Sequence, residues 1–140
     1  MLFVCIIMHT PPNASSNTVN NTVIFIGIPA FLIMARPFDI SNKYDTIIVG
    51  SDQVWRPKYT GGIEKYFLSF ADNRIKKIAY SASFGTDKNE YSFYEKWVCG
   101  KLIKRFDAIS VREESAISLI REQLHWDVDV IQTLDPTMLL

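Results

Sequence analysis

One short stretch decides the fold of this chain: Thr46-Ile47-Ile48-Val49-Gly50-Ser51-Asp52-Gln53-Val54-Trp55. Its first four residues are typical of a buried strand, and the glycine and polar residues that follow predict an abrupt turn. In a parallel α/β sheet, the loops at the carboxyl ends of the strands line the ligand crevice. This loop therefore has a reason to face a substrate. The structural alternative is that Gly50 allows the turn, Asp52 caps the local backbone and Trp55 packs in the core.

Similar apolar runs followed by polar turns recur through the rest of the chain. Strands are predicted at residues 47–49, 77–83, 108–111 and 128–131, and amphipathic helices at about 94–105 and 112–124. This order of elements implies parallel pairing with right-handed crossovers. The sequence therefore predicts an α/β fold with a Rossmann-like parallel sheet and flanking helices.

The first of these helices is expected to cover one face of the sheet with an apolar stripe. Its aromatic residues recur at helical spacing and are interpreted as core rather than as a platform for sugar stacking: Tyr91, Phe93, Tyr94 and Trp97. Gly100, in the middle of the helix, costs about 1 kcal/mol relative to alanine, which weakens the prediction without overturning it.

Residues 1–42 are interpreted as a divergent, poorly defined N-terminal segment that precedes an α/β domain at 43–140. Apolar runs at 1–8 and 23–35 are two possible strands, separated by a turn-prone polar stretch. The first run lacks the basic leading residues of a secretion signal, and the second is too short to cross a bilayer. We therefore expect a cytoplasmic chain without stable membrane insertion.

Composition and motif content exclude several classes of function. Lys plus Arg and Asp plus Glu number 15 each, so no global field attracts the chain to nucleic acid. Cys5 and Cys99 lie far apart without metal-ligand spacing, and the sequence has no glycine-rich dinucleotide or P-loop motif. We predict no cofactor and no metal. Ser81 and Ser83 lack the flanking glycines of a nucleophile elbow, which argues against a hydrolase triad.

Polar residues at the ends of the predicted strands form the candidate site, because parallel strands bring their carboxyl ends to one edge. They are Ser51, Asp52, Ser83, Arg112, Glu113 and Asp135. The carboxylates can orient sugar hydroxyls, act as general bases or hold a hard cation, although a full set of oxygen ligands is lacking. Arg112, at a helix start, suits a bound carboxylate or phosphate. It can equally pair with Glu113, Glu114 or Asp107 and only fix the loop.

Five segments of the chain carry a family resemblance when they are taken together and in order. They are residues 44–55, which end in Gly50-Ser51-Asp52-Gln53-Val54-Trp55; Tyr66-Phe67-Leu68-Ser69-Phe70; Lys77-Ile78-Ala79-Tyr80-Ser81-Ala82-Ser83-Phe84-Gly85; Phe106-Asp107-Ala108-Ile109-Ser110-Val111-Arg112-Glu113; and Leu134-Asp135-Pro136-Thr137. Any one of these segments is a weak signal. Together they resemble the polysaccharide pyruvyl transferase family.

The resemblance implies one half of a fold in which two α/β domains face each other across a cleft, like the two-domain GT-B glycosyltransferases. It implies a transferase that moves a pyruvyl unit from phosphoenolpyruvate to a sugar, leaving a ketal on a bacterial cell-surface polysaccharide or exopolysaccharide. By position, Asp52 or Glu113 would act as catalytic residues that orient an acceptor hydroxyl. Substrate contacts would come from Gly50, Ser51, Gln53, Trp55, Ser83, Arg112 and Asp135.

Two departures from the family pattern limit this expectation. Residues 1–40 do not show the strand and glycine-containing loop with which the family usually starts. The chain also stops at Leu140, where family members continue into a second domain that would carry the opposite wall of the cleft and the general acid. We therefore expect a chain that is incomplete as a catalyst and that needs a C-terminal domain or a second copy of itself.

Two other functions stay open on the sequence alone. One is a noncatalytic α/β binding or interaction module, whose exposed sheet edge and half-cleft would seek a partner chain. The other is a half-domain of a glycosyltransferase of similar architecture that uses a nucleotide sugar as its donor.

Overall fold

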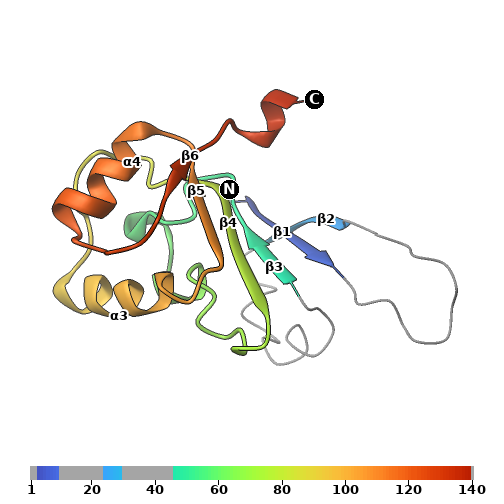
Figure 1. Cartoon of the computed structure of the whole chain (residues 1–140), viewed down its shortest axis with the longest axis horizontal. Coiled ribbons are helices and arrows are strands. Elements are labelled where there is room, and N and C mark those ends of the chain that lie inside the picture. The colour runs from blue at the N-terminus through green and yellow to red at the C-terminus, as the bar shows by residue number, and fades with distance from the viewer. Residues whose placement is uncertain (1–2, 10–23, 30–45, 140) are drawn as a thin grey trace, which may run out of the picture.

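The computed structural model of the chain describes residues 3–9, 24–29 and 46–139. A six-stranded sheet with the order β2-β1-β3-β4-β5-β6 forms its centre (Figure 1). Four neighbouring strands of this sheet are parallel: β3 (Thr46–Val49), β4 (Lys76–Ala82), β5 (Ala108–Val111) and β6 (Ile131–Gln132). The predicted α/β fold with a parallel, Rossmann-like sheet is therefore confirmed.

Two antiparallel strands, β1 (Phe3–His9) and β2 (Ile24–Pro29), extend the sheet at one edge. They coincide with the two apolar runs that predict possible strands near the start of the sequence. β1 also pairs with β3 in antiparallel fashion, with Ile7 opposite Ile48. The described parts of the N-terminal segment thus belong to the same sheet as the parallel strands.

Helices occupy the two predicted positions. α3 (Phe93–Ile103) begins in a capping box, in which Ser92 Oγ accepts from the Glu95 N–H at 3.3 Å and Glu95 Oε2 accepts from the Ser92 N–H at 2.9 Å. α4 (Glu114–Ser118) continues directly into a π-helical turn, η3 (Leu119–Gln123). Short 3₁₀ turns occur at η1 (Pro57–Tyr59), η2 (Ile63–Lys65) and η4 (Pro136–Leu139).

The last strand is shorter than predicted and lies later in the chain. β6 contains only Ile131 and Gln132, whereas residues 128–131 were the expected strand. The Trp126 N–H donates to the Ile120 carbonyl at 3.0 Å, so the chain is still turning back against η3 at this point. Residues before 131 are therefore used to bring the chain past the helix rather than to pair with β5.

The core contains a cluster of five aromatic side chains. Trp55 is fully buried and stacks on Phe67, with ring centroids 4.8 Å apart. Phe84, Tyr91 and Trp126 surround this pair, which confirms the prediction that Tyr91 is core. The Tyr91 hydroxyl donates to the Trp55 carbonyl at 2.5 Å, and burial raises the pKa of Tyr91 well above its usual value. The cluster ties the loop after β3 to the segment that leads into α3.

α3 turns a different face to the core from the one that the sequence predicts. Cys99 and Ile103 are fully buried, whereas Phe93, Tyr94 and Trp97 are 89%, 69% and 54% exposed. The prediction that these three aromatic side chains pack in the core is wrong. Helical spacing identifies a stripe of large apolar residues, but it does not say whether that stripe faces inward.

Gly100 shows why α3 carries a very small residue where Trp126 packs against it. A Cβ at this position would lie 2.7 Å from Trp126 Nε1, so only glycine lets the indole approach the helix so closely. The Trp126 Nε1–H also donates to the Lys96 carbonyl at 3.0 Å, which fixes the ring in place. The aromatic side chains of the core thus come from other elements, and the glycine in α3 leaves space for one of them.

Replacing Gly100 with alanine should destabilise the protein, although alanine is the better helix former by about 1 kcal/mol. The new methyl group would force the Trp126 indole or the helix to shift, and overpacking of this kind costs about 1–3 kcal/mol. Urea unfolding followed by circular dichroism measures the difference. Gly61→Ala is the matched control, because a Cβ at Gly61 meets no atom within 4 Å. A Gly100→Ala protein as stable as the parent would contradict the steric account.

Candidate functional site

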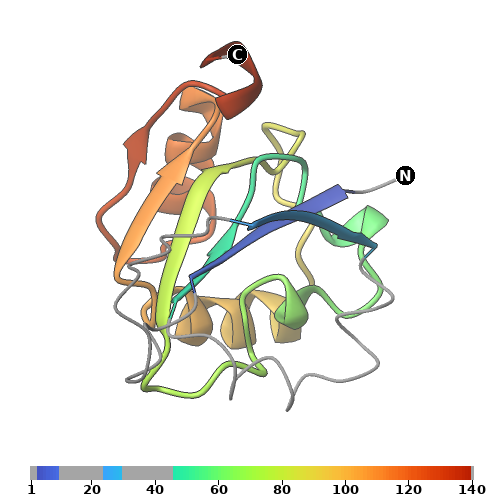
Figure 2. The ribbon, with the colours of Figure 1, turned by 90° about the vertical axis from the view of Figure 1, so that its right-hand side faces the viewer.

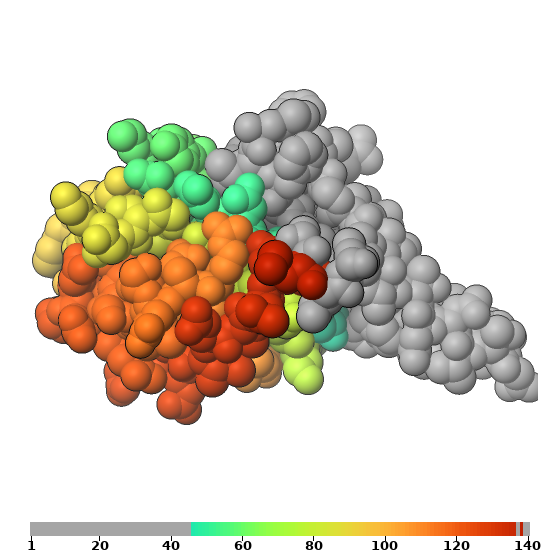
Figure 3. Space-filling model, turned by 90° about the horizontal axis from the view of Figure 1, so that it is seen from above, coloured from blue at the N-terminus to red at the C-terminus, as the bar shows by residue number. Residues whose placement is uncertain are grey.

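The loops after β3, β4, β5 and β6 meet at the carboxyl edge of the parallel strands, and we call them the rim (residues 50–56, 83–85, 112–113 and 133–135). Arg112 connects the loops after β3, β5 and β6. Its Nη1 donates to the Ser51 carbonyl and to Asp135 Oδ2, each at 3.2 Å, and Ser51 Oγ lies 3.5 Å from Asp135 Oδ1. Seen from above, the segments that follow these strands lie close together on one face (Figure 3). The structure thus brings three candidate site residues into contact.

Asp52 holds the loop after β3 through its carbonyl and one carboxylate oxygen, and its second carboxylate oxygen is not used in this way. Its carbonyl accepts from the Val54 N–H at 2.6 Å and from the Ser83 N–H at 3.2 Å. Its carboxylate Oδ1 accepts from the Gln53 N–H at 2.7 Å, which is the local capping role that the sequence suggests as an alternative. Among the residues that the structure describes, the other carboxylate oxygen has no hydrogen-bond partner. Asp52 therefore keeps one acceptor oxygen available at the rim.

Glu113 and Ser83 are hydrogen-bonded to each other. Glu113 Oε1 accepts from Ser83 Oγ at 2.6 Å and from the Phe84 N–H at 3.2 Å. Ser83 is fully buried, and its Oγ also accepts from the Gly85 N–H at 3.0 Å. The other carboxylate oxygen of Glu113 lies 3.5 Å from Arg112 Nε. Both residues hold the loop after β4 to the start of α4.

Arg112 adopts the pairing role that the sequence leaves open, with partners that differ in part from those expected. It pairs with Glu113, as one alternative predicts, and with Asp135 rather than Glu114 or Asp107. Its side chain is 34% exposed, so part of the guanidinium still faces solvent.

Gly50 and Gln53 shape the loop after β3. Gly50 has a φ of 148°, and a Cβ there would overlap the Tyr80 carbonyl, so this position requires glycine. Gln53 packs against Gly85, where an added Cβ would collide with the Gln53 side chain. These two close approaches bring the loops after β3 and β4 together, and they leave Gln53 half-buried rather than fully open to a ligand.

Trp55 is placed in the core, which corrects the expectation that it contacts a substrate. Its side chain is fully buried, and its Nε1–H donates to the Tyr66 carbonyl at 3.2 Å. Both its ring faces and its polar atom are therefore used inside the protein. The structural alternative given by the sequence is the one that the structure supports.

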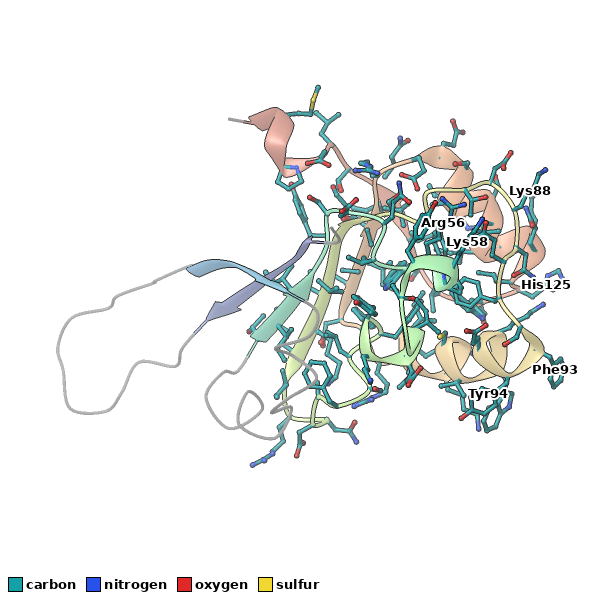
Figure 4. All side chains as sticks on the ribbon, turned by 180° about the vertical axis from the view of Figure 1, so that it is seen from behind. Arg56, Lys58, Lys88, Phe93, Tyr94 and His125 are labelled. Atoms are coloured by element: carbon teal, nitrogen blue, oxygen red, sulfur yellow. The ribbon has the colours of Figure 1, made fainter. Side chains whose placement is uncertain are left out.

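Sequence reasoning missed the ion pair between Arg56 and Glu90. Arg56 Nε and Nη2 donate to the two Glu90 carboxylate oxygens at 3.0 and 2.9 Å, and Nη1 donates to the Gly85 carbonyl at 3.3 Å. Hydrogen bonding to Arg56 lowers the pKa of Glu90. Arg56 lies beside η1 on the ribbon (Figure 4). Only its position directly after Trp55 hinted at a role, and nothing in the sequence points to Glu90.

A hydroxyl cluster, also missed, fixes the loop that carries Asp135. Ser81 Oγ lies 2.8 Å from Thr133 Oγ1, and Thr133 Oγ1 donates to Ser110 Oγ at 2.8 Å. Ser81 Oγ also donates to the Leu134 carbonyl at 2.7 Å. The cluster joins β4 and β5 to the segment after β6, and it holds the neighbouring Asp135 toward Arg112.

The rim carries more negative than positive side chains. Arg56 is balanced by Glu90, which leaves one guanidinium, that of Arg112, beside three carboxylates. Within the described part of the chain, no group of His, Cys, Asp and Glu side chains could hold a metal ion. Carboxylates accept hydrogen bonds from hydroxyl groups, so this arrangement suits a polyhydroxylated ligand better than a strongly anionic one.

These features define an α/β protein with polar loops gathered at the carboxyl edge of a parallel sheet, the position at which this class binds its ligands. A family model described as Polysaccharide pyruvyl transferase matches residues 3–140. The chain therefore belongs to the polysaccharide pyruvyl transferase family, and the match includes the N-terminal segment. No curated protein and no solved structure matches it. Among the described helices, none has the length and apolar character needed to cross a membrane.

Replacing Glu113 with alanine should lower the free energy of unfolding by about 2–3 kcal/mol, because the buried Ser83 hydroxyl and the Phe84 N–H would lose a charged acceptor. Urea denaturation measures this change. Glu114→Ala is the matched control, because Glu114 is the exposed next residue, at the start of α4, and should change stability by no more than about 0.5 kcal/mol. Equal effects of the two substitutions would show that the hydrogen bonds to Glu113 do not hold this loop.

Proposed function

We propose that this chain acts in the transfer of a pyruvyl group from phosphoenolpyruvate to a sugar of a bacterial cell-surface polysaccharide or exopolysaccharide. The family to which the chain belongs supports the proposal. The observation that carries it is the group of rim carboxylates held around Arg112. Because carboxylates accept hydrogen bonds from sugar hydroxyls, we assign the rim to the acceptor sugar rather than to the anionic donor.

The proposed reaction converts two sugar hydroxyls and the enol carbon of phosphoenolpyruvate into a ketal. A proton adds to the methylene carbon, which becomes a methyl group. The enol carbon forms two C–O bonds to the sugar, and its bond to the phosphate oxygen breaks. Of the two protons lost by the hydroxyls, one balances the proton taken up by the methyl group and the other leaves with phosphate. A carboxylate beside an acceptor hydroxyl can take its proton while the C–O bond forms.

Asp52 is the carboxylate that we assign to the acceptor hydroxyl. One of its oxygens is committed to the Gln53 N–H, and the other has no hydrogen-bond partner within the described ranges. Glu113 differs, because its Oε1 already accepts from Ser83 and Phe84. We therefore propose Asp52 as the catalytic residue and Glu113 as a positioning residue that keeps the loop after β4 in place.

We propose that Arg112 lies between the binding site for the acceptor sugar and the binding site for phosphoenolpyruvate. Its ion pair with Asp135 fixes the guanidinium, and its 34% exposed side chain leaves an edge that can contact the donor carboxylate or phosphate. Phosphoenolpyruvate carries several negative charges, and the rim has more carboxylates than guanidinium groups. The proposal therefore requires further cationic groups for the donor from outside the rim.

We infer a cytoplasmic setting for the reaction from the cysteine chemistry. The sequence has two cysteines, Cys5 and Cys99, which lie far apart without a disulfide framework, and Cys99 is free. Free thiols persist in reducing compartments, whereas secreted proteins commonly pair their cysteines.

Replacing Asp52 with asparagine tests the proposed role, because asparagine Oδ1 can still accept from the Gln53 N–H and preserve the loop. We expect ketal formation to fall by at least about 100-fold, since general base catalysis contributes 10²–10⁴-fold. The assay follows phosphate release and the mass increase of a pyruvate-free bacterial glycan in the presence of phosphoenolpyruvate. Asp129→Asn is the control, because Asp129 is an exposed carboxylate outside the rim.

The outcomes of this assay separate the candidate functions. Full transfer by the Asp52→Asn protein would show that Asp52 is not the general base. Absence of ketal with the parent chain, assayed up to protein concentrations at which a second copy can bind, would contradict the catalytic proposal for this chain. Protection of the 50–56 loop by glycan in hydrogen exchange would then favour a binding module. Sugar transfer from a nucleotide sugar, with no use of phosphoenolpyruvate, would instead assign a glycosyltransferase.

A further inference from the structure

The exposed side of α3 carries a compact set of aromatic and basic side chains. Phe93, Tyr94 and Trp97 are 89%, 69% and 54% exposed. Lys101 and Lys104 are exposed on the same side of the helix, and the Lys101 ammonium lies 3.7 Å from the centre of the Trp97 ring. We call these five residues the α3 outer face. Soluble proteins rarely expose neighbouring large apolar side chains without a partner, so this face requires an explanation.

A shallow groove of about 350 Å³ runs along one side of this face. Its lining is mainly aromatic and basic, with Phe93, Trp97 and Trp126 beside Lys101 and Lys104, and it also includes His125. None of these side chains is a carboxylate, an amide or a hydroxyl. The groove therefore offers apolar surface and positive charge, and the imidazole of His125 is the one acceptor group among its lining side chains, which is few for a polyhydroxylated sugar.

We propose that the α3 outer face docks on the surface of a bilayer that contains anionic phospholipids. Lipid phosphates are acceptors with negative charge, which matches the lysines, and the boundary between headgroups and acyl chains accommodates aromatic rings. Trp and Tyr favour this interface because each has an apolar body and a polar tip. The mode is surface binding by one helix face and does not involve a membrane-spanning segment.

The charges around the face support an anionic partner. Glu95, the acidic residue within α3, is tied into the capping box with Ser92. Lys96 donates to the Gln123 carbonyl at 3.0 Å, so it is partly committed to the protein. Lys101 and Lys104 remain directed to the outside, and near an anionic membrane each lysine contributes about a fivefold gain in affinity.

The position of α3 is compatible with a rim that stays open while the protein is on the membrane. Figure 2 shows α3 near the end of the sheet where the parallel strands begin, whereas η4 lies near the end where they finish. Phe93 and Tyr94 project outward from the helix in Figure 4. The docking face and the rim therefore lie at different ends of the domain, and this inference does not depend on the proposed reaction.

The chain contains its own reporter for the test. It has three tryptophans, of which Trp55 and Trp126 are 0% and 5% exposed and Trp97 is 54% exposed. Vesicles of phosphatidylcholine and phosphatidylglycerol should shift the emission of Trp97 to shorter wavelength, and brominated acyl chains should quench it. Vesicles of phosphatidylcholine alone should have a much smaller effect. Added salt should weaken binding, because the lysines act through screened electrostatic attraction.

Two pairs of variants separate specific docking from a general effect of charge. Lys101→Gln/Lys104→Gln should bind anionic vesicles roughly 20- to 30-fold more weakly, and glutamine avoids placing a negative charge at the helix C-terminus. Lys58→Gln/Lys88→Gln makes the same change in net charge at two exposed lysines outside α3 (Figure 4) and should bind like the parent. Phe93→Ser should also weaken binding, whereas Tyr59→Ser, at another exposed aromatic residue, should not.

Several results would overturn the proposal. An unchanged Trp97 spectrum with anionic vesicles would exclude docking. Equal losses of affinity in the two double lysine variants would show that binding depends on the net charge of the protein and not on the α3 outer face. A Trp97 response to a soluble acidic glycan, with none to vesicles, would assign the groove to a saccharide. A spectral shift that depends on protein concentration in the absence of lipid would assign the face to a second copy of the chain.

Discussion

Burial of Trp55 is the constraint on which the geometry of the rim depends. The indole stacks on Phe67 and donates to the Tyr66 carbonyl, so the residue is held on its face and at its polar edge. Its backbone N–H donates to the Ser83 carbonyl at 3.1 Å, and the Ser83 N–H donates to the Asp52 carbonyl at 3.2 Å. The loops after β3 and β4 thus continue to pair beyond the ends of their strands. Truncation of a buried tryptophan typically costs about 3–5 kcal/mol, which is a large share of the stability of a small domain.

A polar layer built on this apolar anchor sets the positions of the charged groups. Arg112 can contact groups from three loops at once, because its guanidinium has several donors in a fixed plane. The segment that carries Asp135 is held in turn by hydrogen bonds from Thr133 to the hydroxyls of Ser81 and Ser110. The rim is therefore held by side chains from β4, from β5 and from the loops after β5 and β6. After these contacts are made, one carboxylate oxygen of Asp52 has no hydrogen-bond partner among the described residues.

Sequence patterns predicted the strands and the edge at which the candidate residues gather, because β-branched runs that end in glycine or serine are local signals. The partners within the rim were not predictable, since Arg56 and Glu90, or Arg112 and Asp135, meet only through the order of strands in the folded sheet. Trp55 was ambiguous for the same reason. A tryptophan in a turn can face a ligand or the core, and only the surrounding aromatic side chains decide between the two.

The error about α3 is informative, because the same residues that misled the sequence analysis define its exposed surface. Gly100 is small because the Trp126 indole, which packs against Phe67, lies directly against the helix there. α3 contributes Cys99 and Ile103 to the core, and its exposed aromatic side chains take no part in that packing. Their presence on the solvent side, next to exposed lysines, is therefore better explained by an external apolar and anionic surface than by folding.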